Sequence, residues 1–229
     1  MANGHPLDRA VWNALTTRQA RFALGDARAL RFEPPIGLFA AAADGSAASL
    51  EALAALCPPG EGLALLEIDE RPAPPGMAVI ERGVCWQMVA EAITATEAAF
   101  AITPLTEDDA PAMLALATLT KPGPFFARTH QLGGFIGVRR DGALAAMAGE
   151  RMKLPGFSEV SGVCTHPDHR GRGYAAALTA RVAARILARG ETPFLHVFAD
   201  NAGAIAVYQT LGFRLRRAMA LTVVGRGAI

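Results

Sequence analysis

The chain has 229 residues, and its 22 Lys and Arg side chains nearly balance its 21 Asp and Glu side chains, which leaves a formal net charge of +1. This balance gives no overall field that would attract nucleic acid or an anionic membrane, so we expect neither as a partner. Three cysteines without a CxxC spacing argue against a disulfide framework and a zinc knuckle. Because no apolar leader and no membrane-length apolar run occurs, we expect a cytoplasmic protein.

The first half of the chain is divided into short elements by clusters of proline and glycine at 33–35, 57–60 and 71–76. Between these breaks the pattern predicts helices at about 7–23 and 47–56, and strands at about 63–68 and 77–80. No group of side chains suited to catalysis occurs before Phe100. We therefore expect structural support from this half.

The second half begins with a predicted helix from Thr106 to Ala117, whose first turn carries acidic residues that favour the positive end of a helix. Two strand-like runs at 134–139 and 143–151 are joined by Asp141-Gly142, a dipeptide that suits a tight hairpin turn. The pattern then predicts a strand (159–165), a long helix (173–189), a strand (194–198), a short helix (201–211) and a last strand from 213. This order indicates a mixed α/β sheet.

The segment Arg170-Gly171-Arg172-Gly173-Tyr174-Ala175 lies between a predicted strand and a predicted helix. Its glycines permit backbone conformations that point successive N–H groups at one anion, and the helix behind them adds its positive end. Together with the two arginines, this pattern predicts a cradle for a phosphate or pyrophosphate. Taken alone, the hexapeptide is equally compatible with a solvated basic turn that caps a helix.

A dinucleotide-binding fingerprint is a competing interpretation, because Gly171-x-Gly173-x-x-Ala176 matches its relaxed form. That fingerprint places its first glycine directly at the end of a strand, whereas residues 165–170 intervene here. Asp200 also falls later than the fingerprint's acidic residue should. No lysine follows the glycines, as a phosphate-binding P-loop would require.

The downstream residues favour another interpretation. Asn201, Ile205 and Tyr208 sit at i, i+4 and i+7 and so share one face of the predicted helix. Arg170-x-x-Gly173-x-Ala175, followed by Asp200-Asn201-x-x-Ala204-x-x-x-Tyr208-x-x-x-Gly212-Phe213, resembles the GNAT N-acetyltransferase superfamily. The resemblance covers the chain from about Leu105 to Val223.

This resemblance implies a GNAT acyl-CoA N-acyltransferase fold that uses acetyl-CoA as co-substrate and needs no metal. It implies that the strand at 159–165 separates from its neighbour and pairs its backbone with pantetheine. It also implies that Tyr208 stands near the coenzyme sulfur as general acid, although Tyr208 could instead be a core aromatic beside Phe213. The residues that it assigns to the cofactor are Val163, Cys164, Thr165, Arg170, Gly171, Arg172, Gly173, Tyr174, Ala175 and Asn201.

Direct attack by an amine requires a neutral nitrogen, and deprotonating a lysine-like ammonium at pH 7 costs about 4–5 kcal/mol. Glu159 is a candidate base, because strand alternation would place it on the same face as Val163, but it could also be a surface glutamate at a strand end. Glu150 on the preceding strand is a competing candidate. His130 and His196 are weaker ones.

Other reactive side chains receive structural interpretations. His166 and His169 lack a third ligand at a suitable spacing, so we expect no metal site. Cys164 has no evident base and is interpreted as a buried strand residue. Phe125, Phe126 and His130 could line an acceptor pocket or pack in the core.

We therefore expect transfer of an acetyl group from acetyl-CoA to an amine of a small molecule or protein, in one direct step. Two alternatives remain open: a non-catalytic acyl-CoA sensor and a nicotinamide-dinucleotide-dependent oxidoreductase. Residues 1–98 are expected to form a degenerate GNAT-like support domain, and residues 99–229 the catalytic domain. A homodimer is compatible with the sequence, which does not identify the acceptor.

Overall fold

A computed structural model describes residues 4–96 and 98–226. Its elements, in chain order, are η1 (Pro6–Arg9), α1 (Ala10–Leu15), η2 (Ala20–Phe22), β1 (Ala23–Gly25), β2 (Ala29–Phe32), β3 (Ala40–Ala42), α2 (Ala47–Ala55), β4 (Gly62–Glu67), β5 (Ala78–Val89), β6 (Thr103–Pro104), η3 (Glu107–Asp109), α3 (Ala110–Thr120), η4 (Thr129–Leu132), β7 (Ile136–Arg140), β8 (Ala143–Leu154), β9 (Phe157–Thr165), η5 (Pro167–His169), α4 (Tyr174–Ala188), β10 (Thr192–Phe198), α5 (Ala202–Thr210) and β11 (Arg214–Gly225).

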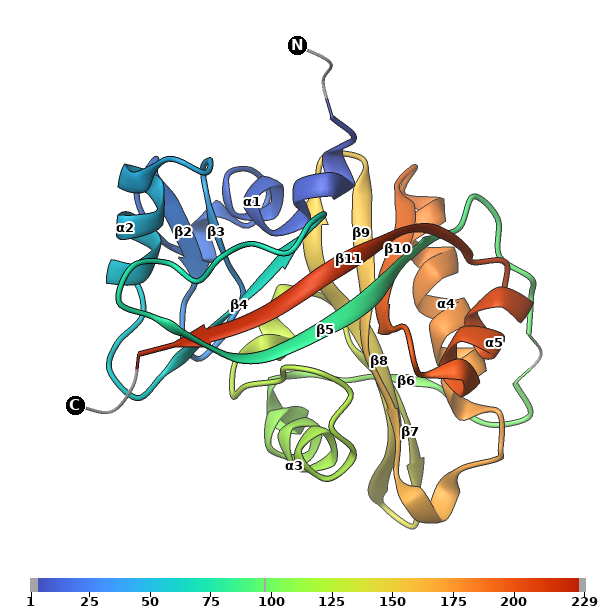
Figure 1. Ribbon diagram of the computed structural model, residues 1–229. Helices are drawn as coiled ribbons and strands as arrows, with labels where there is room; N and C mark the ends of the chain where they lie inside the picture. The colour runs from blue at the N-terminus through green and yellow to red at the C-terminus, as the bar shows by residue number, and fades with distance from the viewer. Residues whose placement is uncertain (1–3, 97, 227–229) are drawn as a thin grey trace.

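The strands form one large twisted sheet and one small sheet (Figure 1). The large sheet has eight strands in the order β4-β11-β5-β10-β9-β8-β7-β6, and the small one has the order β1-β2-β3. Within the large sheet β10 and β9 run parallel, and the other neighbouring strands run antiparallel. The predicted mixed α/β fold is confirmed.

A strand from the first half of the chain lies inside the sheet of the second half. β5 pairs with β10 on one side, where Met88 faces Leu195, and with β11 on the other, where Met88 faces Leu215. β4 pairs with the other side of β11 and forms the edge strand of the sheet. The two parts of the chain therefore share one sheet, and the proposed boundary near residue 98 stays a prediction.

β5 is much longer than the predicted strand at 77–80. Its first part carries exposed polar residues such as Glu81 and Arg82, followed by Gly83, so the sequence there lacks a buried face. Its last part is buried at Cys85, Gln87 and Met88, where it lies between two neighbouring strands. The strand is thus extended by pairing, not by local propensity.

Helices cover both faces of the large sheet. Ala146 and Ala148 of β8 belong to the core that includes α4, whereas Met147 between them belongs to the core that includes α3. This alternation follows from the opposite directions of successive side chains in a strand. The small alanines leave room for α4, whose buried face includes Leu178 and Val182.

The helix predicted at 7–23 is shorter in the structure, where α1 ends at Leu15. The chain then turns so that the buried Gln19 side chain can satisfy the backbone of β8. Its Nε2 donates to the carbonyl of Arg151 at 2.6 Å, and its Oε1 accepts from the N–H of Lys153 at 3.0 Å. These contacts lie where the pairing of β8 with β9 shifts register, so Gln19 replaces ladder hydrogen bonds lost there.

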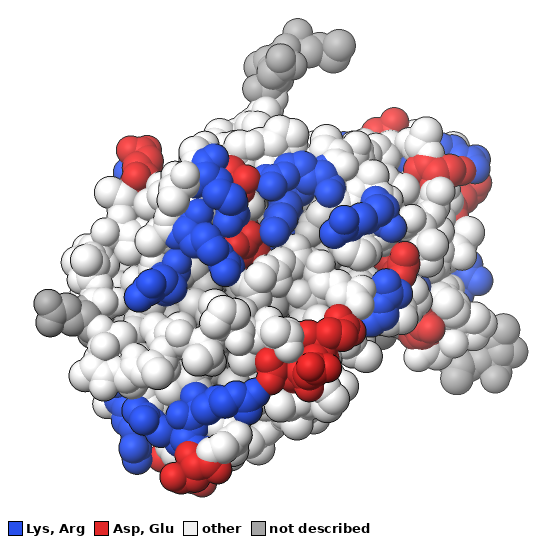
Figure 2. All heavy atoms as spheres, turned by 180° about the vertical axis from the view of Figure 1, so that it is seen from behind, with Lys and Arg blue, Asp and Glu red and all other residues white. Residues whose placement is uncertain are grey.

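The described residues contain no helix that is long and apolar enough to cross a membrane. Figure 2 shows one face of the molecule, on which basic side chains lie beside acidic ones. Such a mixture fits the small net charge of the chain.

Candidate active site

A gap opens in the middle of the large sheet where β9 and β10 separate. Their parallel pairing ends at Phe194 and Glu159, after which β9 continues to Thr165 and β10 continues to Phe198. Gly162 has φ +63° beside a register shift against β8, which bends β9 at this point. A cavity of about 430 Å³ is lined by the end of β9, the start of α4 and one face of α5.

The turn before α4 forms one wall of this cavity. Gly171 and Gly173 have φ angles of 74° and 76°, a region that favours glycine, and a Cβ added at either would meet no heavy atom within 4 Å. The space in front of the glycines is therefore open, and the free N–H groups of the first turn of α4 add a positive potential. The turn has the form of an anion cradle.

Two buried polar atoms of the cavity wall have no hydrogen-bond partner among the described residues. They are Thr165 Oγ1 and His169 Nδ1. Unpaired buried polar groups are costly, so their position beside the cradle fits a polar ligand with donors and acceptors.

Every residue that the sequence analysis assigned to the cofactor lines this cavity, namely Val163, Cys164, Thr165, Arg170, Gly171, Arg172, Gly173, Tyr174, Ala175 and Asn201. The Tyr174 side chain, however, is buried: its hydroxyl oxygen accepts a hydrogen bond from Arg140 Nε at 2.6 Å, and its ring packs edge-on against Phe100. Its hydroxyl is therefore engaged away from the cradle. The binding roles of the ten cavity residues stay predictions.

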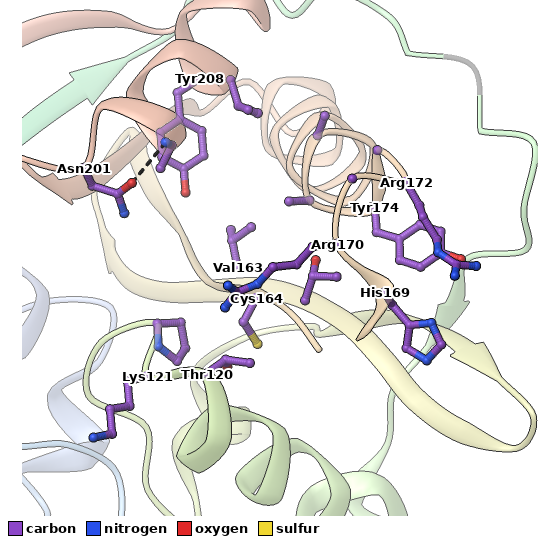
Figure 3. A pocket seen from close by; sticks show the side chains of 18 residues that line it. Thr120, Lys121, Val163, Cys164, His169, Arg170, Arg172, Tyr174, Asn201 and Tyr208 are labelled. Carbon is purple, nitrogen blue, oxygen red and sulfur yellow. Dashed lines mark hydrogen bonds between the residues drawn. The ribbon is translucent and has the colours of Figure 1, made fainter. Parts of the chain in front are cut away.

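Asn201 and Tyr208 lie on the α5 side of the cavity (Figure 3). Asn201 Oδ1 accepts a hydrogen bond from the N–H of Ala204 at 3.1 Å and so caps α5, which leaves the Nδ2 donors for a ligand. The Tyr208 hydroxyl points into the cavity, while its ring packs against Phe213 at 6.1 Å. Burial raises the pKa of Tyr208 to about 12, so the hydroxyl remains a hydrogen-bond donor.

A second cavity of about 180 Å³ adjoins the first. The two share six lining residues: Lys121, Pro122, Val163, Asn201, Ala204 and Tyr208. Phe39, Leu66 and Cys85 of the first half form part of its wall. These three could not be identified from the sequence, because they are ordinary apolar residues that only the shared sheet brings to the site.

The residues expected to line an acceptor pocket line neither cavity. Phe125 packs edge-on against Phe135, and His130 Nε2 forms a 2.8 Å contact with Glu107. Phe126 is half-buried, and its N–H donates to Thr129. For this segment the packing interpretation fits the structure.

Glu159 is placed where it cannot readily accept a proton. It is fully buried, receives two hydrogen bonds from the Arg151 guanidinium at 2.8 and 2.6 Å, and contacts His196 Nδ1 at 2.8 Å. Burial by itself would raise the pKa of Glu159, but Arg151 and His196 outweigh burial and lower the pKa to about 2. The expectation that Glu159 acts as the base is not supported by this geometry.

Glu150 is also engaged elsewhere. Its carboxylate pairs with Arg185 of α4 at 2.8 Å, with Arg189 just after α4 at 3.0 Å, and with Lys153 at 3.0 Å. Burial raises the pKa of Glu150, but these cations outweigh burial and lower it. Since Glu150 lines neither cavity, its role as a base is not supported either.

The cysteines beside the two cavities are protonated thiols. Burial raises the pKa of Cys164 and of Cys85 to about 11, which disfavours the nucleophilic thiolate. Within the described part of the chain, no group of three or more His, Cys, Asp or Glu side chains is arranged to hold a metal ion.

Comparisons with known proteins agree with this geometry. The FR47-like protein family matches residues 135–221, which include the cradle and α5. A putative acetyltransferase from the GNAT family of Novosphingobium aromaticivorans is 46% identical, with a TM-score of 0.91; the match covers 98% of this chain and 100% of that chain. No protein of curated function matches the sequence.

Two more distant structures share the fold alone. A GCN5-related N-acetyltransferase from Kribbella flavida is 20% identical, with 96% of this chain and 93% of that chain covered and a TM-score of 0.63. A GCN5-related N-acetyltransferase-like protein from Streptococcus suis is 14% identical, with 93% and 91% covered and a TM-score of 0.58. The chain therefore has the fold of an acyltransferase. By its identity to the Novosphingobium structure over its whole length, it belongs to the GNAT family.

Proposed function

We propose that this protein is an N-acetyltransferase that transfers the acetyl group of acetyl-CoA to an amine. The observation that carries the proposal is the position of Tyr208, which lines both the cavity with the cradle and the second cavity. A cofactor held by the cradle and an acceptor held in the second cavity would meet at this residue. A sensor that only binds the cofactor would have no need for the second cavity.

The residues of the first cavity fit coenzyme A. The N–H groups around Gly171 and Gly173, with Arg170 and Arg172, would hold the pyrophosphate. The backbone of β9 around Val163 has lost its neighbour β10 and is free to hydrogen-bond the pantetheine amides. Asn201 Nδ2 would donate a hydrogen bond to the same arm.

Bound acetyl-CoA would supply a thioester as the acyl donor. The amine nitrogen forms a bond to the acyl carbon, the carbon–sulfur bond breaks with its electron pair on sulfur, and the nitrogen loses one proton while the sulfur gains one. At a pKa of about 12, Tyr208 is a weaker acid than a thiol, whose ordinary pKa is about 8.5. Tyr208 would therefore stabilise the developing negative charge by donating a hydrogen bond, with little net transfer of its proton.

Acetyl-CoA should bind to the purified protein and stabilise it. At about a hundred times its dissociation constant, a ligand that binds only the folded state adds roughly 2.7 kcal/mol, so the melting temperature should rise by about 5–10 °C. Calorimetry gives the affinity, and thermal melts with and without ligand give the shift. Binding of a nicotinamide dinucleotide without binding of coenzyme A would contradict the proposal.

Replacing Tyr208 by Phe should lower turnover by roughly ten- to a thousandfold, because the ring and its packing stay while the hydrogen bond to sulfur is lost. Release of free coenzyme A measures the rate, and calorimetry with acetyl-CoA should show little change in affinity. Turnover equal to that of the native protein would remove the hydroxyl from the mechanism and leave Tyr208 as a core aromatic.

A further inference from the structure

The charge of the second cavity restricts what it can hold. Two cationic side chains, Lys121 and Arg151, belong to its wall, and no Asp or Glu does. Its remaining wall is mostly apolar, with Phe39, Phe198 and Leu221 among its members. An amine acceptor that carries a second positive charge would be repelled by these cations. An acceptor that carries one negative charge and an apolar body would fit.

Arg151 is the most fixed of these cations. Its residue is only 9% exposed, its guanidinium lies over the Phe39 ring at 4.7 Å, and its Nε and Nη2 donate to Glu159. Its Nη1 has no hydrogen-bond partner among the described residues. The guanidinium is thus held on one edge by Glu159 and on one face by Phe39, with the donors of Nη1 left for a ligand.

Glu159 and His196 hold this guanidinium in place. His196 Nδ1 contacts Glu159 at 2.8 Å, and His196 Nε2 lies 3.0 Å from Gln87 Nε2. The Gln87 amide is oriented by its hydrogen bonds to the carbonyl of Leu7 and from Arg216. His196 therefore accepts a hydrogen bond from the Gln87 amide at Nε2 and donates a hydrogen bond to Glu159 from Nδ1, which leaves it no lone pair for a substrate. We assign it a positioning role.

We propose that the second cavity binds an acceptor that is a small amine carrying a carboxylate, with the carboxylate on Arg151 Nη1 and the amine at the junction beside Tyr208. The proposal rests on the proposed acetyltransferase function and adds the class of acceptor. Lys121 is shared by both cavities, and Figure 3 shows its side chain pointing away from the centre of the first. Its ammonium adds a second attraction for the carboxylate.

This binding mode also eases deprotonation of the amine. A carboxylate near an ammonium favours the charged form of the nitrogen, and pairing of that carboxylate with Arg151 weakens the effect. A larger share of the bound amine is then neutral, with its proton passed to solvent before the attack, so neither Glu159 nor Glu150, which are engaged elsewhere, has to act as the base.

The test compares amino acids with their uncharged carboxamides, which are matched in shape, and with a diamine that carries a second positive charge. The panel holds alanine, valine, leucine and phenylalanine as free amino acids, their carboxamides, and 1,5-diaminopentane, each assayed for release of free coenzyme A from acetyl-CoA. We expect kcat/KM for the amino acids to exceed that for the amides by about 10- to 100-fold, the size expected for one charged hydrogen bond. The diamine should be the poorest acceptor.

A variant then ties this preference to Arg151. Replacing Arg151 alone would leave the Glu159 charge buried and unpaired, so the double variant Arg151→Met with Glu159→Gln removes both charges and keeps an acceptor for His196. We expect KM for the best amino acid to rise about 10- to 100-fold and the preference over its amide to disappear, with acetyl-CoA affinity unchanged. Lys121→Gln should show a smaller rise in KM. Lys153 lies outside the cavity, so Lys153→Gln should leave KM for the amino acid unchanged.

The outcomes separate this proposal from the proposed function. Failure to bind acetyl-CoA would contradict both. Acetyl-CoA binding with equal or better turnover of the amides or the diamine would overturn only the acceptor class. The acceptor class would also be overturned if the protein acetylates no amino acid of the panel and calorimetry on the coenzyme A-saturated protein detects no binding of these amino acids at millimolar concentration. An unchanged amino acid preference in the double variant would remove Arg151 as the contact.

Discussion

A fragment that begins near Ala99 should be insoluble or poorly folded, because deletion of residues 1–98 removes the strand between β10 and β11. β5 contributes Met88, which is fully buried, and it pairs along most of β11. Without it, two strand edges and an apolar surface that includes Leu195 and Met219 would be exposed, which favours aggregation. Size-exclusion chromatography and far-ultraviolet circular dichroism of the fragment give the result.

Two controls show whether the lost strand is the cause. Co-expression of residues 1–98 as a separate chain should restore a soluble complex, since β5 could again pair with both neighbours. In the full chain, Met88→Ala should lower the free energy of unfolding by about 2–5 kcal/mol, whereas Val84→Ala on the exposed part of β5 should change it by less than about 0.5 kcal/mol. A soluble, monomeric and fully active fragment would show instead that the first half is an independent module.

The longer helices and strands of the second half could be predicted from sequence because local signals bound them, whereas the short β6, η4 and η5 were not predicted. The hairpin turn at Asp141-Gly142 has positive φ at both residues, as that dipeptide favours, and α4 ends before Gly190, which has φ +74°. The place of β5 could not be predicted. Its exposed part carries Glu81 and Arg82, and nothing local indicates that residues more than a hundred positions later will pair with it.

In the candidate site, too, some residues could be predicted from the sequence and others could not. The cradle is one continuous segment, so its residues could be named from the sequence, and they line the cavity. The buried pairing of Glu159 could not be predicted, because two residues of β8, Arg151 and Met152, lie opposite it at a register shift. The guanidinium reaches the carboxylate there, a contact that regular strand alternation does not indicate. The second cavity combines residues from both halves, which the sequence pattern does not connect.

Replacing Gly173 by Val should abolish acetyl-CoA binding and leave the chain folded. Gly173 has φ +76°, where a β-branched residue is strained by about 1–2 kcal/mol, and its side chain would occupy the open space in front of the cradle. The backbone N–H groups could then neither keep their direction nor be approached by a pyrophosphate. Calorimetry with acetyl-CoA measures the loss, and circular dichroism should remain that of the native fold.

Gly190→Val is the matched control, because Gly190 follows the other end of α4, has φ +74° and also has open space around its Cβ position. Both variants should lose a similar amount of stability in a denaturant titration, since the backbone strain is the same in kind. Only Gly173→Val should lose affinity for acetyl-CoA. Native affinity in Gly173→Val, or an equal loss of affinity in both variants, would show that the turn before α4 is a surface cap and that the cofactor is held elsewhere.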